Sequence, residues 1–295
     1  QHPGKPDPPP SRGHAAPAGV QTSGFGAARN GLQAAAARET AARLAAGAIA
    51  KKLLGELGVS ILSHVVAVGP VESKSQVRLV PGDLDRIDQS PVRCNDPDAE
   101  AAMIDEIKAA AKDGDSLGGV VEVLAYGVPV GLGSHVHWDR KLDALLAQAL
   151  MSIQAVKGVE IGDGFEVATR RGSAAHDPIA WDADDHRYVR ESGLAGGVEG
   201  GISTGEVVMA RVAMKPLATL NRPVLKTVDT VTKEETVSFK ERTDVTAVPA
   251  LGVVAETMMA LVLADETTRK FGGDSVVELV RNAESYLAQL DGGAG

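Results

Sequence analysis

The chain has 295 residues, of which 44% are hydrophobic, 23% charged and 3% aromatic, and its formal net charge at pH 7 is −9. A chain of this length and apolar content can bury a sizeable core. The acidic balance and the few aromatic side chains argue against nucleic acid as a partner, because such binding needs clustered basic residues and stacking surfaces.

The cysteine content and the chain ends bear on cellular location. Cys94 is the only cysteine, so no intrachain disulfide can form, which is typical of a reducing cytoplasm. Residues 1–30 are rich in proline and glycine and predict a flexible lead-in, and residues 291–295 predict a short tail. The sequence shows neither a signal peptide nor a membrane span, so we expect no membrane partner.

The first half of the chain mixes helical and strand patterns. Gly58 is typical of a helix end, Asp96 and Pro97 of a helix start, and Gly114 of a second helix end. Together with apolar periodicity and β-branched runs, these signals predict helices at 32–57, 97–112 and 142–151, and strands at 59–68 and within 118–134.

The second half continues without strict alternation of strands and helices. The stretch 170–195 is polar and predicts a mobile loop, and Asp274 is a candidate cap for the last helix. Periodicity predicts strands at 159–168, 207–214 and 237–240, and helices at 254–269 and 275–290. This mixture favours an α+β fold over a doubly wound sheet.

Three histidines are candidates for chemistry. His135 and His137 in SHVHWD would share one face of a strand, as two metal ligands can, but no third ligand follows at a usual spacing, so a solvated loop and no metal site are favoured. His64 lies in the apolar run ILSHVVAV, and we interpret it as a hydrogen-bonded strand residue.

The stretch GGVEGGISTGE at 196–206 has five glycines in eleven positions. Glycine costs conformational entropy on folding and is used where the chain needs a positive φ or approaches a ligand closely. A functional turn before the strand at 207–214 is therefore expected.

Charged residues close to predicted strand and helix ends offer a second candidate site. Lys215 in MKPLAT would place an ammonium at the rim of a sheet, where it could meet a phosphate or a carboxylate, although a solvated lysine fits as well. Arg242 and Asp244 stand two apart and share one side if extended, and an exposed ion pair would explain them equally.

Long runs of this sequence resemble the chorismate synthase family. They are ARETAARLAAGAIAKKLL at 37–54, DGDSLGGVVEVLAYGVPVGLGS at 113–134, LDALLAQALMSIQAVKGVEIGDGF at 142–165, AGGVEGGISTGE at 195–206, AMKPLAT at 213–219 and RTDVTAVPALGVVAETMMALVLAD at 242–265. The runs follow the family's order over nearly everything after residue 37. On this resemblance, residues 31–290 form one chorismate synthase-like domain.

The resemblance implies a fold, a reaction and a cofactor. The fold would be a β-α-β sandwich with helices packed outside the sheets, assembled as a homotetramer. The reaction would be the 1,4-elimination of phosphate from 5-enolpyruvylshikimate 3-phosphate to give chorismate, with reduced FMN as a cofactor that is not consumed.

The resemblance also implies site residues. Gln154, Ala155, Gly200 and Arg242 match flavin-contacting positions, and so does the segment Lys215, Pro216, Leu217, Ala218 and Thr219. Because Gly200 has no side chain, the flavin could approach its backbone. We expect Lys215, Arg242 and the backbone around Gly200 to converge on a single dihydroflavin pocket.

Two residues match acid–base residues of the family, and two others differ from the residues that the family has at their positions. Asp244 matches the acid that assists proton removal, and His14 in SRGHAA resembles the histidine of the family's PGHAD segment. Ala34 and Ala36 stand where the family has an arginine and a serine that help to hold the flavin.

Other departures leave two functions open. The family's SHG histidine and several substrate-binding arginines have no match in this sequence, which resembles an N-terminally truncated or degenerate member. One interpretation is an active chorismate synthase, and the alternative is a catalytically inactive paralogue or remnant that at most binds flavin or associates with an intact homologue.

Overall fold

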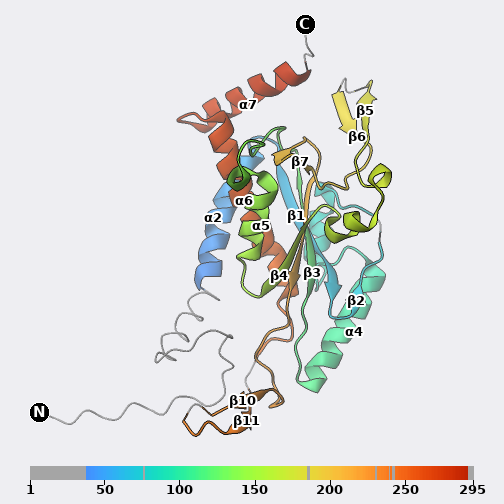
Figure 1. Cartoon of the computed structure of the whole chain (residues 1–295), viewed down its shortest axis with the longest axis vertical. Coiled ribbons are helices and arrows are strands. Elements are labelled where there is room, and N and C mark those ends of the chain that lie inside the picture. Colours follow the sequence, from blue (N-terminus) through green and yellow to red (C-terminus); the bar gives the residue numbers. More distant parts are fainter. Residues whose placement is uncertain are drawn as a thin grey trace, which may run out of the picture.

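The computed structural model describes residues 38–75, 77–184, 187–229, 231–238, 240 and 243–291 (Figure 1). The helices are α2 (Glu39–Gly55), α3 (Leu84–Gln89), α4 (Pro97–Asp113), α5 (Leu142–Met151), α6 (Val248–Phe271) and α7 (Val276–Asp291). The strands are β1 (Ser60–Val68), β2 (Val71–Glu72), β3 (Gly119–Tyr126), β4 (Val156–Ile161), β5 (Ile179–Asp182), β6 (Arg187–Arg190), β7 (Val198–Glu199), β8 (Ile202–Ser203), β9 (Val208–Met214), β10 (Lys226–Val228) and β11 (Glu235–Val237).

One antiparallel sheet organises the described part of the fold. Its strand order is β2-β1-β3-β9-β4, and three hairpins, β5-β6, β7-β8 and β10-β11, form separate two-stranded sheets. Strands and helices do not alternate as in a parallel sheet, so the predicted α+β class is confirmed.

Helices α2, α5 and α6 cover one face of the large sheet (Figure 1). Strand side chains of that face, such as Val121 and Val212, pack with helix side chains such as Leu54 and Met259 in the main core. Helix α6 is apolar and long enough to cross a membrane, yet 61% of its most apolar window is buried in the fold. Its hydrophobicity therefore serves the protein core.

Most predicted elements of the first half are confirmed. The Asp96 side chain accepts hydrogen bonds from the main-chain N–H groups of Asp98 and Ala99, and Gly114 ends α4 with a positive φ of 70°. In contrast, α2 already ends at Gly55, and Gly58 lies in the turn that leads to β1. Local capping signals thus located this part of the fold to within a few residues.

Several expectations for the second half were wrong in detail. The polar stretch 170–195 contains the β5-β6 hairpin, and the strand predicted at 159–168 is β4, which begins at Val156 and gives way to a 3-10 helix at Gly164–Thr169. The strand predicted at 237–240 is β11, which ends at Val237.

The last two helices also begin differently from the prediction. Helix α6 begins six residues before the predicted start because proline is tolerated in a first turn. For α7, Ser275, not Asp274, accepts the N-terminal hydrogen bond from the N–H of Glu278.

The other face of the large sheet carries a row of paired ionisable side chains. His64, Glu122, Arg211 and Glu160 stand directly opposite one another on β1, β3, β9 and β4. His64 Nε2 lies 3.3 Å from Glu122 Oε1, and Arg211 Nε donates to Glu122 Oε2 at 3.0 Å. His64 is therefore a hydrogen-bonded strand residue, as predicted.

The environment of Glu122 predicts how stability depends on pH. Burial alone would raise the pKa of Glu122, but the hydrogen bonds with His64 and Arg211 outweigh burial and lower this pKa from its ordinary 4.5. A carboxyl whose pKa is lowered by folding contributes stability above its unfolded pKa, and this contribution is lost as pH falls through the folded value.

We expect Glu122→Gln to lower the free energy of unfolding at pH 7 by about 1–3 kcal/mol, since two partners lose a charged acceptor. Below about pH 4.5 the difference from the wild type should shrink. This difference in the free energy of unfolding can be measured by urea titration at several pH values between 7 and 3, with circular dichroism as the signal. A difference that stays constant across this range would contradict the assignment.

Candidate functional site

Two of the predicted segments meet at the end of strand β9. The main-chain N–H of Lys215, the residue after β9, donates to the carbonyl oxygen of Ala155 at 2.9 Å. Ala155 follows Gln154 in the turn between α5 and β4 and has a φ of +66°. Such a conformation is uncommon and costly for a residue with a side chain, although Arg93 and Lys233 adopt it as well.

A turn before β3 holds the segment 215–219 in place. The buried Ser116 donates from its hydroxyl to the carbonyl oxygen of Leu217 at 2.7 Å. A side chain at Gly118 would place its Cβ 2.3 Å from the main-chain oxygen of Met214, so only glycine allows this close approach. The motif DGDSLGG therefore shapes the site, although sequence reasoning did not single out Ser116.

The segment before α6 joins the same place. The hydroxyl of Thr219 donates to the hydroxyl of Thr243 at 2.9 Å, and the N–H of Leu117 donates to the carbonyl oxygen of Val245 at 2.7 Å. Asp244, between these two anchors, is exposed. Residues 154–155, 215–219 and 243–244 therefore gather at one end of the sheet, and we call this set the Gln154–Lys215 site.

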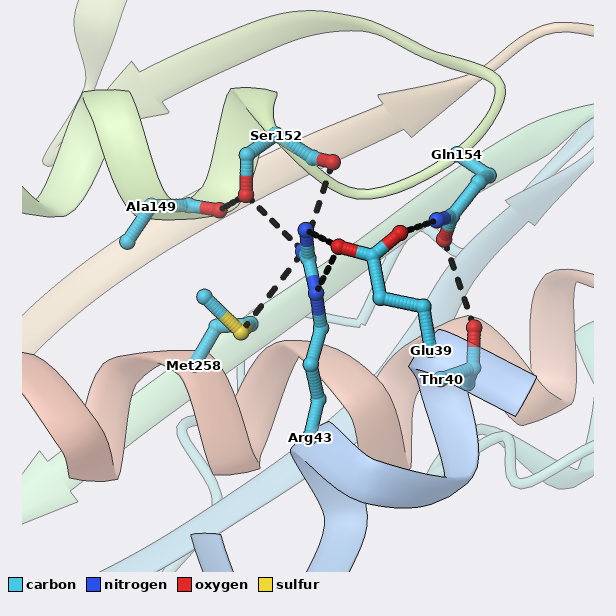
Figure 2. Close-up of polar contacts among 7 residues, drawn as sticks. All are labelled: Glu39, Thr40, Arg43, Ala149, Ser152, Gln154 and Met258. Carbon is cyan, nitrogen blue, oxygen red and sulfur yellow. Dashed lines mark hydrogen bonds and ion pairs between the residues drawn. The ribbon is translucent and has the colours of Figure 1, made fainter. Parts of the chain in front are cut away.

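The first turn of α2 closes one side of this site (Figure 2). Gln154 Nε2 donates to Glu39 Oε2 at 3.0 Å, and the hydroxyl of Thr40 donates to Gln154 Oε1 at 3.3 Å. Arg43 bonds Glu39 Oε1 and the hydroxyl of Ser152. These α2 residues were quoted for their family likeness, but nothing in the sequence indicated which residues they would contact.

Two charged groups of the site are available to a ligand. The Lys215 ammonium is exposed, and it has no hydrogen-bond or ion-pair partner in the part of the chain that the structure describes. The Asp244 carboxylate is likewise exposed and without such a partner among the described residues. Pro216 and Ala218 are exposed too, and Leu217 and Thr219 are half-buried.

The glycine-rich stretch forms a different part of the molecule. Gly200 turns the β7-β8 hairpin with a φ of +60°, and a Cβ there would meet nothing within 4 Å. Its neighbours are packed: a Cβ at Gly196 would lie 2.3 Å from the main-chain nitrogen of Gly162, and one at Gly197 would lie 2.4 Å from the carbonyl oxygen of Val207. Internal packing and positive φ thus explain most of the glycines of this stretch. At Gly200, by contrast, no atom of the described chain lies close to the position of a Cβ.

The structure does not bring Gly200 and Lys215 together. Gly200 precedes the first residue of β9, Lys215 follows the last, and β7 and the β10-β11 hairpin lie toward opposite ends of the sheet (Figure 1). Seven strand residues at about 3.3 Å each separate them by roughly 20 Å. Of the other predicted site residues, His14, Ala34, Ala36 and Arg242 lie outside the described residues.

A polar cavity of about 540 Å³ lies on the sheet face opposite α2, α5 and α6. It is lined by charged side chains that include His64, Glu122, Arg170 and Arg211, and none of the predicted site residues lines it. Several of these charged side chains are neutralised by ion pairs, since Arg170 bonds Asp163 and Arg211 bonds Glu122.

The structure also places the histidines that were weighed as metal ligands. His135 and His137 are exposed on a loop, and no metal-binding cluster of His, Cys, Asp or Glu occurs in the described ranges.

Comparison with known proteins gives one family. The family model for chorismate synthase matches residues 7–268. A chorismate synthase of Streptomyces coelicolor is 59% identical over 283 residues, covering 96% of this chain and 71% of that protein. One from Leifsonia xyli is 56% identical over 279 residues, covering 94% and 69%. A crystal structure of chorismate synthase aligns with a TM-score of 0.73 and 41% identity, covering 86% of this chain and 70% of that one.

The family match and these relatives place the chain among enzymes of small-molecule metabolism, and its α+β fold agrees with that of the solved relative. The chain belongs to the chorismate synthase family. This family consists of lyases of aromatic amino acid biosynthesis that use reduced flavin. Identities of 56% and 59% over nearly the whole chain give no support to the alternative of an inactive remnant.

Proposed function

We propose that this chain catalyses the 1,4-elimination of phosphate from 5-enolpyruvylshikimate 3-phosphate to give chorismate, with reduced FMN bound at the Gln154–Lys215 site. The observation that carries the proposal is the meeting of residues 154–155, 215–219 and 243–244 at one end of the sheet. Each segment lies in a run that resembles the family, and the chain brings them together from positions up to 90 residues apart.

The groups at the site fit a phosphorylated flavin. The Lys215 ammonium can hold a phosphate or a carboxylate, and the Gln154 amide and the Thr219 hydroxyl offer donors and acceptors for the edge of a ring. Reduced FMN, when bound, supplies electron density that assists the departure of phosphate. The residues of the chain bind and orient the reactants, since elimination requires a fixed geometry.

Proton transfer falls to the acid–base residues. We assign to the Asp244 carboxylate the acceptance of the ring proton of the substrate, since it is exposed at the site. By family likeness, His14 donates a proton or hydrogen bond to the flavin, Arg242 holds the flavin, and Ala34 and Ala36 line its site. These four assignments remain proposals.

Turnover under exclusion of oxygen tests the proposed function. The purified chain is mixed with reduced FMN and 5-enolpyruvylshikimate 3-phosphate, and released phosphate is followed over time. We expect release only when both compounds are present. Failure to release phosphate, together with failure to bind reduced FMN, would contradict the proposal.

We also propose that the chain works as a homotetramer in the cytoplasm, without nucleic acid or membrane partners. Because Gly200 and Lys215 lie at opposite ends of β9, the Gly200 hairpin of one copy would complete the site of another. Light scattering in solution measures the mass of the assembly, and a monomer would contradict this part of the proposal.

Co-expression of two inactive variants tests the shared site. If Lys215→Ala and Gly200→Leu copies mix at random, about a quarter of the sites receive both intact residues from different copies, and activity returns to about that level. A mixture as inactive as its components would show that both residues serve a site within one copy.

A further inference from the structure

We infer that Glu39 is a positioning residue that fixes the orientation of the Gln154 side-chain amide in the flavin site; this inference rests on the proposed function. Glu39 begins α2, and Gln154 lies 115 residues later, in the turn between α5 and β4. Together with the Thr40 hydroxyl, Glu39 connects the first turn of α2 to a predicted flavin-binding residue (Figure 2).

The chemistry of the contact selects one amide orientation. The Glu39 carboxylate can only accept hydrogen bonds, so the Gln154 group that faces it must be the NH2. The 3.0 Å distance from Nε2 to Oε2 fits this orientation. The Thr40 hydroxyl donates to Oε1 on the other side of the amide at 3.3 Å. A flipped amide would place its oxygen against a negative charge.

Arg43 holds the Glu39 carboxylate in the position from which it contacts Gln154. The Arg43 guanidinium bonds Glu39 Oε1 from one turn further along α2, at 2.6 Å from Nη2 and 3.2 Å from Nε. Its Nη1 donates to the hydroxyl of Ser152 at 2.9 Å and to the Ser152 carbonyl oxygen at 3.3 Å. Glu39 Oε1 thus faces Arg43, while Oε2 faces Gln154.

The consequence is a preorganised recognition group. An amide that can flip offers a ligand either an oxygen or an NH2 at the same point, and selecting one on binding costs affinity. With Glu39 present, this selection is made before the flavin arrives. Arg43, which neutralises the Glu39 carboxylate, also limits its repulsion of an anionic ligand.

A double-mutant cycle on FMN binding tests the inference. We expect Glu39→Gln to raise the Kd of reduced FMN about twofold, because an amide divided between two orientations presents the binding orientation only about half of the time. Gln154→Ala should raise it about tenfold or more, and Glu39→Gln should add nothing in the Gln154→Ala background. The control Asp105→Asn, which removes an exposed acid paired with Lys108 on α4, should leave the Kd unchanged. Independent, additive losses would show that Glu39 acts only on the fold.

A flavin-free measurement separates this inference from the proposed function. The side-chain NH2 of Gln154 should give one set of NMR resonances in the wild type, and Glu39→Gln should shift or broaden them by exchange between two orientations. Resonances unchanged by Glu39→Gln would overturn the inference. If these resonances respond as expected but the wild type binds no FMN, the proposed function fails while the orienting contact stands.

Discussion

Replacing Asp244 by asparagine is expected to lower kcat by about 100-fold to 10,000-fold, the range by which a positioned base accelerates proton transfer. Asparagine has nearly the same shape as aspartate but cannot accept the ring proton. Because Asp244 is exposed and its neighbour Thr243 is held by Thr219, the substitution should leave the local chain in place. The Kd of reduced FMN should therefore change little.

Anaerobic phosphate release and a flavin titration, made on the same sample, measure these two effects. The matched control is Asp274→Asn, an exposed aspartate in the turn between α6 and α7, which should retain wild-type kcat. Equal losses of kcat and flavin affinity in Asp244→Asn would show that this carboxylate binds flavin and is not the base.

Substituting valine for Gly47 is expected to lower the stability of the fold strongly. Gly47 lies where α2 crosses α6, and a Cβ there would stand 2.2 Å from the Cβ of Thr257, far inside van der Waals contact. Thr257 is itself buried, so the two helices must separate. Overpacking of this kind costs about 1–3 kcal/mol or more. Because α2 carries Glu39 and Thr40, flavin affinity should fall as well.

Thermal and urea unfolding, combined with a flavin titration, check this prediction. Gly55→Ala on the same helix is the control, since a Cβ at Gly55 would meet nothing within 4 Å. Alanine has the higher helix propensity, so this variant should be unchanged or up to about 1 kcal/mol more stable. A Gly47→Val protein as stable as the wild type would contradict the close packing of α2 on α6.

Where the fold could be predicted from sequence, local signals marked the element ends. The Asp96 cap and Gly114 bounded α4, and the β-branched run identified β1. The β5-β6 hairpin was missed because polar residues hide its short strands in a stretch that reads as a loop. The helix predicted at 254–269 was too short, because α6 already begins at Val248, with Pro249 in its first turn.

The site was predictable only in part. Gln154, Ala155 and the segment 215–219 were reached through the family likeness, and the structure places them together. The roles of Glu39, Arg43 and Ser116 could not be predicted, because their contacts join residues about 100 positions apart and leave no periodic pattern. Gly200 was easy to single out because its motif is rich in glycine, but its predicted place beside Lys215 was wrong for a single chain, where the two residues lie far apart.

A crystal structure of the protein soaked with FMN in the absence of oxygen tests the central claim most directly. The account predicts flavin density at the end of β9, in contact with Gln154 and with residues 215–219. Flavin bound only elsewhere, for example in the cavity lined by His64 and Arg211, would contradict it.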